Sequence, residues 1–443
     1  MIRAGTLQKV AAIVLIGIAA ALYLARGRPG EKRGPGPSIM PDVGASIRLV
    51  VCTVNSARRA MLRNADLVTG IVNALPARVH FLLIVNDPAA FTVASNPYPE
   101  RVRFINLPAE TSITIWPQDP FVVLTDADGN KSVLVSRTFD RVGDRQIPYA
   151  IAKELRWPCR DSALSFEGGN IVADERHAFV GANTIRHNGV TLEQDEAEIV
   201  RQFERELGRP VLVVGPVPQP IGHVDMMLTP LGDQRLMLAD PGRGATLAEQ
   251  ELTDSPNRVA AFEASCEKMF FGTPAIQELR DLKGHVVRPP QVVGQTRKAI
   301  DDSRAVAGQL DRLAEELSAR GYQVIRIPYL FVRREPAQRE QGRSTTRRVT
   351  TATAPSDPNS AGDQEEEWGA PKYPELTYNN VLLETVEGRR IVYLPQYGWE
   401  ALDSDARRVW QENGCEVHAV DGFAISAMYG GSLRCCVKVL GRD

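Results

Sequence analysis

The feature that most constrains the fold is a repeated alternation of short β-branched runs and amphipathic stretches, which starts near residue 46 and continues to the C-terminus. Short apolar runs favour strands, whereas apolar residues spaced three and four apart favour helices. The expected strands cover residues 47–52, 79–85, 121–125, 132–136, 170–173, 178–181, 210–214, 226–229, 235–239, 323–327, 377–384 and 390–395, and a final strand holds Cys435. The expected helices cover residues 57–75, 146–156, 192–207, 301–321 and 404–413. The recurring order of strand, strand, helix and strand predicts a single α/β domain built from like modules.

The N-terminal end carries an unbroken apolar stretch over residues 10–25, preceded by Arg3 and Lys9. It is slightly shorter than the roughly 20 residues that span a bilayer comfortably. Tyr23 stands where a signal peptidase requires a small side chain. The sequence therefore favours an uncleaved signal anchor or transmembrane segment over residues 1–26, which would place a membrane-anchored catalytic domain outside the cytoplasm. A cleaved signal peptide, giving a secreted protein, is the second interpretation, and a buried N-terminal helix is the third.

The remaining domain boundaries follow from composition. Residues 27–45 are rich in Gly, Pro, Lys and Arg and are predicted to form a flexible tether to a catalytic domain over residues 46–443. Within that domain, residues 335–371 are polar and charged, which predicts a disordered insertion. The 52 Lys and Arg residues nearly balance the 54 Asp and Glu residues, so charge alone gives no attraction to nucleic acid. The six cysteines are too widely spread to form a disulfide framework.

Four short motifs carry the chemistry of the chain: WPQDP at 116–120, FEGGN at 166–170, GHVD at 222–225 and GGSLRCC at 430–436. Each places a reactive or ionisable side chain close to glycine or proline, which is typical of turns and strand ends. Three carboxylates, one histidine and one cysteine suit a cationic substrate better than an anionic one. Taken singly, each motif has a structural explanation, as a turn carboxylate, a satisfied histidine or a small core cysteine.

Taken together and in this order, the four motifs resemble those of the guanidino-group modifying superfamily, which includes arginine, agmatine and protein-arginine deiminases and amidinotransferases. The resemblance covers residues 46–443 apart from the insertion. It implies the pentein fold, a five-bladed ββαβ propeller with pseudo-fivefold symmetry and its active site at the central axis. The protein-arginine deiminase catalytic domain is the most similar member, on Gln118-Asp119 and the GHVD motif. Glu167-Gly168-Gly169 and Arg434 are similar to arginine and agmatine deiminases as well.

The resemblance implies a role for each motif residue. Asp119 and Asp225 would bind the guanidinium, and Cys435 would attack its carbon atom as a thiolate. His223 would transfer protons, and Glu167 would orient His223 or raise its pKa. The implied catalytic residues are therefore Cys435, His223, Asp225, Asp119 and Glu167, and the implied substrate-binding residues are Asp119, Asp225, Trp116, Asn170 and Arg434. Cys436 is an alternative nucleophile, although the spacing from the glycine pair favours Cys435. Residues 378–380 either line the site or form a turn.

The expected function is hydrolytic deimination of arginine, which gives citrulline and ammonia through a cysteine thiouronium intermediate. Arginine in a peptide or protein is the first expected substrate. The alternatives are an agmatine or free-arginine deiminase, an amidinotransferase and a degenerate, non-catalytic guanidinium-binding protein. No cofactor is expected, and the oligomeric state is left open. Calcium-dependent relatives carry acidic residues shortly after the substrate-binding aspartate, whereas Phe121, Val122 and Val123 stand here. We therefore expect activity without added calcium, and no metal-binding residues are predicted.

Overall fold

The computed structural model describes residues 36–54, 64–86, 99–270, 279–280, 286–287, 291–333 and 373–443. The predicted anchor at 1–26, the first part of the tether and the predicted insertion at 335–371 lie outside these ranges. Among the helices that are described, none combines the length and the apolar character needed to cross a bilayer. This finding contradicts the predicted membrane-anchored location, which is not retained.

One supersecondary unit recurs through the fold and has the predicted order. In its simplest form, β5 (Phe121–Thr125) pairs antiparallel with β6 (Lys131–Val135). Helix α3 (Gln146–Leu155) then leads to β7 (Cys159–Asp161), which lies parallel to β6. The helix is needed because a strand that returns in parallel requires a long crossover.

The same unit recurs in four more sheets of the described chain. The second unit consists of β8 (Ile171–Ala173), β9 (Ala178–Gly181), α4 (Ala182–Leu192), α5 (Glu196–Leu207) and β10 (Val211–Val214). The third consists of β11 (Leu228–Gly232), β12 (Arg235–Asp240), α6 (Pro241–Asp254), α7 (Pro256–Lys268), α8 (Thr296–Ala319), β15 (Gln323–Leu330) and the short edge strand β16 (Leu376–Thr377). The fourth consists of β17 (Leu382–Val386), β18 (Arg389–Pro395), α9 (Glu400–Glu412) and β19 (Cys415–Val420). The fifth joins both ends of the described chain and consists of β20 (Lys438–Arg442), β2 (Ile47–Val54), α2 (Ala65–Ala74), β3 (His80–Val85) and β4 (Val102–Asn106).

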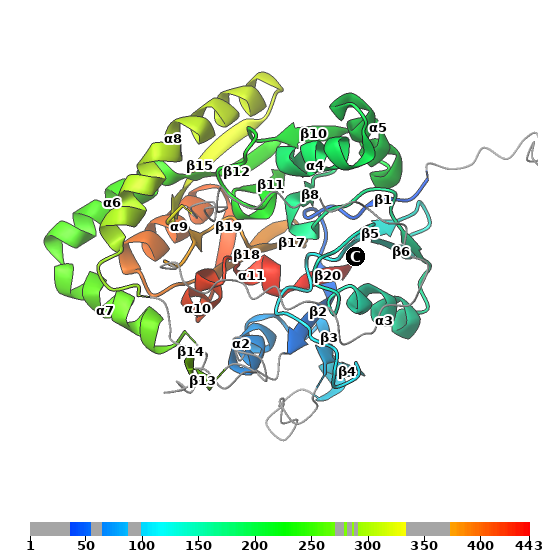
Figure 1. Cartoon of the computed structure of the whole chain (residues 1–443), viewed down its shortest axis with the longest axis horizontal. Coiled ribbons are helices and arrows are strands. Elements are labelled where there is room, and N and C mark those ends of the chain that lie inside the picture. The colour runs from blue at the N-terminus through cyan, green and yellow to red at the C-terminus, as the bar shows by residue number, and fades with distance from the viewer. Residues whose placement is uncertain are drawn as a thin grey trace, which may run out of the picture.

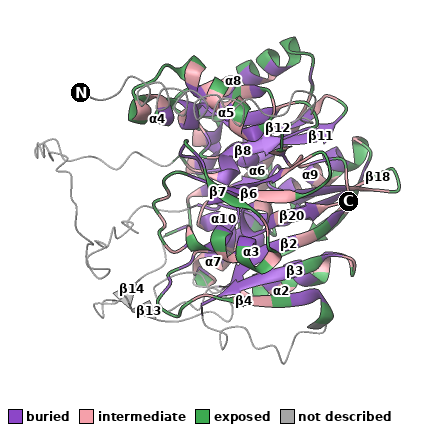
Figure 2. Ribbon diagram, turned by 90° about the vertical axis from the view of Figure 1, so that its right-hand side faces the viewer, coloured by how far each residue is buried: buried purple, intermediate pink, exposed green. Residues whose placement is uncertain are grey.

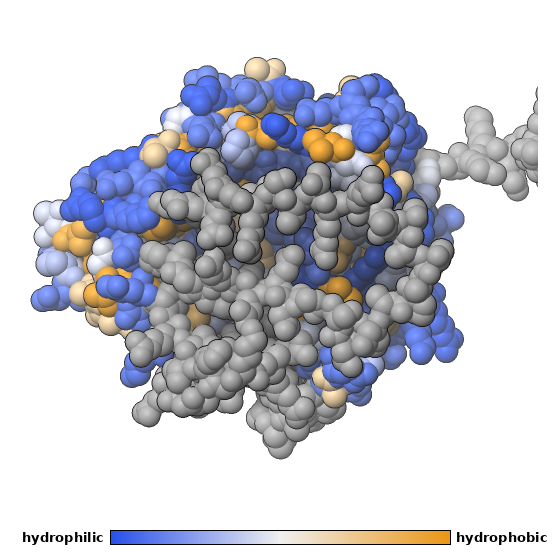
Figure 3. Space-filling view, viewed as in Figure 1, coloured by the Kyte–Doolittle hydropathy of each residue, from blue (hydrophilic) through white to orange (hydrophobic). Residues whose placement is uncertain are grey.

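The α/β class predicted from the sequence is confirmed by these units, whereas a closed five-bladed ring stays a prediction. In the view of Figure 1 the longer helices, such as α3, α5 and α8, lie toward the outside, and α11 (Leu433–Cys436) lies near the middle. The strands are largely buried, as Figure 2 shows, and the helices expose their outer faces. The described surface in Figure 3 is mostly hydrophilic, with scattered hydrophobic residues.

The structure differs from the predicted boundaries at its N-terminal side. Residues 36–45 belong to the folded part and are not a tether: β1 (Ser38–Ile39) pairs with β5, and the Met40 amide donates to the carbonyl of Val123 at 3.0 Å. The tether was predicted because this segment is polar and contains proline. Such a sequence can still pair as an edge strand, because an edge strand needs little hydrophobic content of its own.

Several helices and one pair of strands also differ from the predicted elements. Cys435 lies in the short helix α11 and not in a strand, since β20 begins at Lys438. The helix predicted over residues 192–207 corresponds to α5, which begins four residues later, whereas Leu192 is the last residue of α4. Asp195 caps α5, because its carboxylate accepts a hydrogen bond from the Glu198 amide at 2.7 Å. Helices α6 and α7 were not predicted at all. The ribbon of β13 (Leu279–Arg280) and β14 (Val286–Val287) was not predicted either.

Candidate active site

The candidate nucleophile, Cys435, is held by an asparagine from another unit. The Asn380 amide nitrogen lies 3.2 Å from the Cys435 sulfur, and its amide oxygen accepts a hydrogen bond from the Cys435 backbone at 3.0 Å. The Asn380 backbone carbonyl also accepts from the Arg434 amide. Asn380 lies between β16 and β17, where residues 378–381 interrupt the predicted strand. Two directional contacts from one buried amide therefore fix both the backbone and the thiol of Cys435.

The candidate acid and base is the pair of His223 and Glu167. His223 precedes the 3-10 helix η5 (Val224–Met226), and Glu167 precedes the 3-10 helix η4 (Gly168–Asn170). Their side chains meet with 2.6 Å between Nε2 and Oε2. Burial lowers the pKa of His223, but the Glu167 hydrogen bond and the charges of Asp119, Glu167 and Asp225 outweigh it and raise this pKa to about 9. The imidazole is thus protonated near neutral pH, as a proton donor must be.

The two candidate guanidinium ligands, Asp119 and Asp225, are buried and held from behind by arginines. Asp119 Oδ2 accepts a hydrogen bond from Arg141 at 2.6 Å, and Asp225 Oδ2 accepts one from Arg434 at 2.7 Å. The other oxygen of each carboxylate, Oδ1, is buried and has no hydrogen-bond partner among the described residues. Buried polar atoms are rarely left without a partner, so this pair indicates a place for a donor-rich ligand. A planar guanidinium supplies donors of this kind.

The side chains of His223, Asp119 and Asp225 approach one another beside Gly169. A Cβ atom on Gly169 would lie 2.6 Å from His223 Nδ1, 3.0 Å from Asp119 Oδ1 and 3.3 Å from Asp225 Oδ2. The three side chains therefore converge on one position of the η4 backbone. The FEGGN motif needs glycine here because any side chain would occupy the space in which these groups meet.

The electrostatics of the thiol are set by the same carboxylates. Burial raises the pKa of the Cys435 thiol well above its usual value, and the charges of Asp225 and Asp119 raise it further. A cation bound between the two carboxylates would cancel their effect on the sulfur. The thiol is therefore protonated in the empty site and becomes easier to ionise when a cation binds.

The other predicted substrate-binding residues have different surroundings. Trp116 packs beside Gly431, where an added Cβ atom would lie 2.5 Å from the ring, so its indole borders the turn that precedes Cys435. The Asn170 side chain is occupied by Thr184, Gln219 and the amide of Val224. Its contacts fit a role in positioning the His223 segment better than the predicted contact with substrate.

Arg434, which is also predicted to bind substrate, contacts two carboxylates of the protein. Its guanidinium bridges Asp225 and Asp42, the latter at 3.0 Å. Both of these carboxylates therefore pair with the Arg434 guanidinium. A substrate guanidinium, which is also a cation, would be repelled by Arg434. Two partners in this arrangement, Arg141 and Asp42, were missed, because no motif surrounds either residue in the sequence. Asn380 was left open between a lining and a turn role, and its contacts assign it to the site.

No protein-family model and no curated protein matches this chain. Solved structures do match over nearly the full length. An agmatine deiminase of C. jejuni has 13% identity and a TM-score of 0.53, with 91% of this chain and 95% of that chain covered. A putative arginine deiminase from Porphyromonas gingivalis has 16% identity and a TM-score of 0.51, with 92% and 98% covered. An agmatine deiminase of Enterococcus faecalis has 12% identity and a TM-score of 0.53, with 92% and 96% covered. These likenesses establish a fold shared with guanidino-group modifying enzymes, as the motif resemblance implied.

Proposed function

We propose that the chain is a cysteine hydrolase that deiminates an alkylguanidinium, giving a ureido product and ammonia. The observation that carries this proposal is a pair of buried carboxylate oxygens, Asp119 Oδ1 and Asp225 Oδ1, that accept no hydrogen bond from the described residues. They lie beside a histidine that is charged near neutral pH and a thiol. As part of the proposal, the five sheets are the blades of a pentein propeller around this site.

In the first half of the reaction, the guanidinium binds between Asp119 and Asp225 and lowers the pKa of the Cys435 thiol, which releases its proton to solvent. The thiolate attacks the guanidinium carbon and forms a C–S bond. The tetrahedral adduct then breaks one C–N bond. His223 donates its proton to the leaving nitrogen, which departs as ammonia, and an S-alkylthiouronium remains.

In the second half, water replaces the ammonia. His223, now neutral, accepts a proton from this water as its oxygen attacks the thiouronium carbon. The C–S bond breaks, the hydroxyl proton of the adduct passes to the departing Cys435 sulfur, and the ureido product and the Cys435 thiol are released. Glu167 contacts Nε2 of His223, so the other ring nitrogen, Nδ1, faces the interior of the site. This nitrogen lies 3.9 Å from Asp119 Oδ1.

Arginine in a peptide is the first proposed substrate, because Gln118-Asp119 and the GHVD motif resemble the protein-arginine deiminase domain. Agmatine is the second, since two of the similar structures carry the name of agmatine deiminase. An amidinotransferase would use the same residues but pass the amidino group to an amine. A non-catalytic protein would bind guanidinium and leave the thiol inert.

The test measures ammonia and ureido product from the full chain with an N-acylated arginine peptide, free arginine and agmatine. We expect product from at least one of them, and its identity gives the substrate class. Cys435→Ala is expected to abolish product formation, whereas Cys436→Ala is the matched control and is expected to retain it. A folded protein that yields no product from any of the three substrates would overturn the proposal. Amidino transfer to an added amine, in place of hydrolysis, would indicate the transferase.

A further inference from the structure

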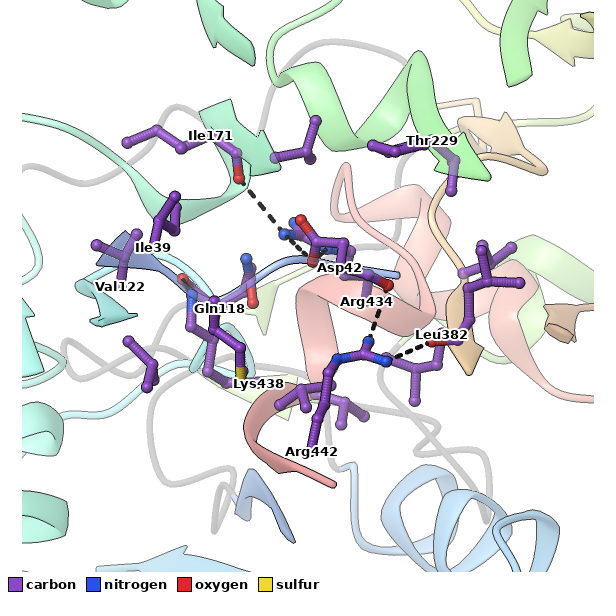
Figure 4. A pocket seen from close by; sticks show the side chains of 18 of the residues that line it. Ile39, Asp42, Gln118, Val122, Ile171, Thr229, Leu382, Arg434, Lys438 and Arg442 are labelled. Atoms are coloured by element: carbon purple, nitrogen blue, oxygen red, sulfur yellow. Dashed lines mark hydrogen bonds and ion pairs between the residues drawn. The ribbon is translucent and has the colours of Figure 1, made fainter. Parts of the chain in front are cut away.

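A small cavity of about 40 Å³ lies next to the candidate active site, and Figure 4 shows its lining. Most of the lining is apolar, including Val122, Leu228 and Val439. Cys435, His223 and Glu167 do not belong to it, so it is distinct from the candidate active site. Arg434 lies between the two, because it lines the cavity and also holds Asp225.

The charges around this cavity do not balance. Four of the lining residues are ionisable, namely Asp42, Arg434, Lys438 and Arg442. They supply three cations and one carboxylate. That carboxylate, on Asp42, is paired with Arg434 at 3.0 Å. The remaining cations, Lys438 and Arg442, therefore face the cavity with no counter-ion in the lining.

Neither of these two cations forms an ion pair with a carboxylate among the described residues. Lys438 is buried, and within the same residues its Nζ has one polar contact, at 3.5 Å to the carbonyl of Gln118. It also lies 5.2 Å from the centre of the Phe121 ring. Arg442 donates to the carbonyls of residues 42, 45 and 383, while its Nε is buried and has no partner within the described structure. A buried charge without a counter-ion is costly, so Lys438 either loses its proton or gains an anion. The Arg442 guanidinium keeps its proton, and a bound anion would stabilise it.

Nearby carboxylates outside the lining do not fill this role, because each already has a cation. Asp119 is held by Arg141, Asp225 by Arg434 and Glu384 by Arg78. Burial, together with Arg434, lowers the pKa of Lys438 to about 7, although the charges of Asp42, Asp119 and Asp225 oppose this effect. Burial likewise lowers the pKa of Arg442 to about 10, with Asp42 and Glu384 opposing and Arg434 assisting.

We propose that this cavity binds a small inorganic anion, chloride in the first instance, with the Lys438 ammonium and the Arg442 guanidinium as its cationic ligands. Its size fits such an occupant, because roughly 10–15 Å³ of space of this kind holds one water molecule. A chloride ion is only slightly larger than a water molecule, so the cavity has room for it. The apolar remainder of the lining suits a weakly hydrated halide. A bound anion would keep Lys438 protonated, three residues after Cys435.

The first test measures the melting temperature of the full chain at constant ionic strength while sodium chloride replaces sodium gluconate. We expect a saturable rise of a few degrees in chloride, because a ligand that binds the folded state stabilises it. Lys438→Met should remove the chloride-specific rise, and Lys153→Met, at an exposed position on α3, is the matched control that should retain it. Equal melting temperatures of the wild-type chain in the two salts would overturn the proposal.

A second test does not depend on any variant. Crystals of the full chain soaked in sodium bromide should show an anomalous peak in the cavity near Lys438 and Arg442. Density for water alone, without an anomalous peak, would overturn the proposal. Neither test uses catalysis, so a failure here is distinguishable from a failure of the proposed deiminase activity.

Discussion

Gly169 sets the spacing of the candidate active site at the scale of single residues. Gly169→Ala would place a methyl group within 3.3 Å of His223, Asp119 and Asp225 and so force them apart. We expect kcat/KM to fall by about 100-fold, which corresponds to about 2.7 kcal/mol of lost transition-state stabilisation. Gly222→Ala is the matched control, since a Cβ atom there meets nothing within 4 Å. Similar kinetics for the two variants would contradict this interpretation of Gly169.

Asn380 is the second residue whose removal has a defined effect. Asn380→Ala deletes the donor that lies 3.2 Å from the Cys435 sulfur. A hydrogen bond to a charged group contributes about 1.5–3 kcal/mol, so the thiol pKa should rise by about one unit or more. Alkylation of Cys435 by iodoacetamide, followed by mass spectrometry at mildly alkaline pH, should slow by about tenfold. Labelling of the exposed Cys159 serves as the internal control and should not change. Unaltered labelling of Cys435 would rule out this role.

Among the elements, the turns before η4 and η5 set the pH range of activity through Glu167 and His223. The pKa of His223 lies above its ordinary value, so the imidazolium stabilises the folded protein fully below about pH 6.5, and this contribution is lost as the pH rises through about 9. Glu167→Gln removes the carboxylate charge that helps to raise the pKa of His223. The alkaline limb of the kcat/KM profile should therefore move toward lower pH. Glu154→Gln, at an exposed position on α3, is the control. An alkaline limb that stays in place would contradict the assignment to His223.

The segment around β1 contributes to the site although it lies far from the motifs in sequence. Its Asp42 accepts from the Ala173 amide at 2.9 Å and pairs with Arg434. A chain that starts at residue 45 would leave Arg434 buried beside Asp225 alone, and loss of one partner of a buried pair costs about 3 kcal/mol or more. We expect a lower melting temperature and a lower kcat for it. A chain that starts at residue 36 keeps every described contact and is the control. Equal behaviour of both truncations would contradict this role of β1.

At the scale of the whole molecule, the two ends of the described chain share one sheet, because β2, close to its start, pairs with β20, its last strand, and with β3. The site is thus assembled from segments that span most of the chain, and its charges are neutralised by Arg141, Arg434 and His223. Within the described residues, no group of three or more His, Cys, Asp and Glu side chains could hold a metal ion. We predict that EDTA leaves kcat/KM unchanged. Activity that falls in EDTA and returns with calcium would contradict this prediction.

Local sequence determined the order of many of the strands and helices and pointed to the candidate catalytic residues. Apolar periodicity acts over a few residues, so β5, β6 and α3 could be predicted within one residue of their observed ends. The motif residues Cys435, His223, Asp225, Asp119 and Glu167 could be named because their types and order are distinctive. Their arrangement around Gly169 was not visible in the sequence.

Tertiary structure alone decided what surrounds these residues. Arg434 and Asp42 are 392 positions apart, and Arg141 reaches Asp119 across 22 positions with no motif around it. Cys435 lies in a helical turn although its neighbours favour a strand, because the contacts of Asn380 hold that backbone from another unit. Buried charges need partners, and which partner is near depends on packing between distant units and not on local propensity.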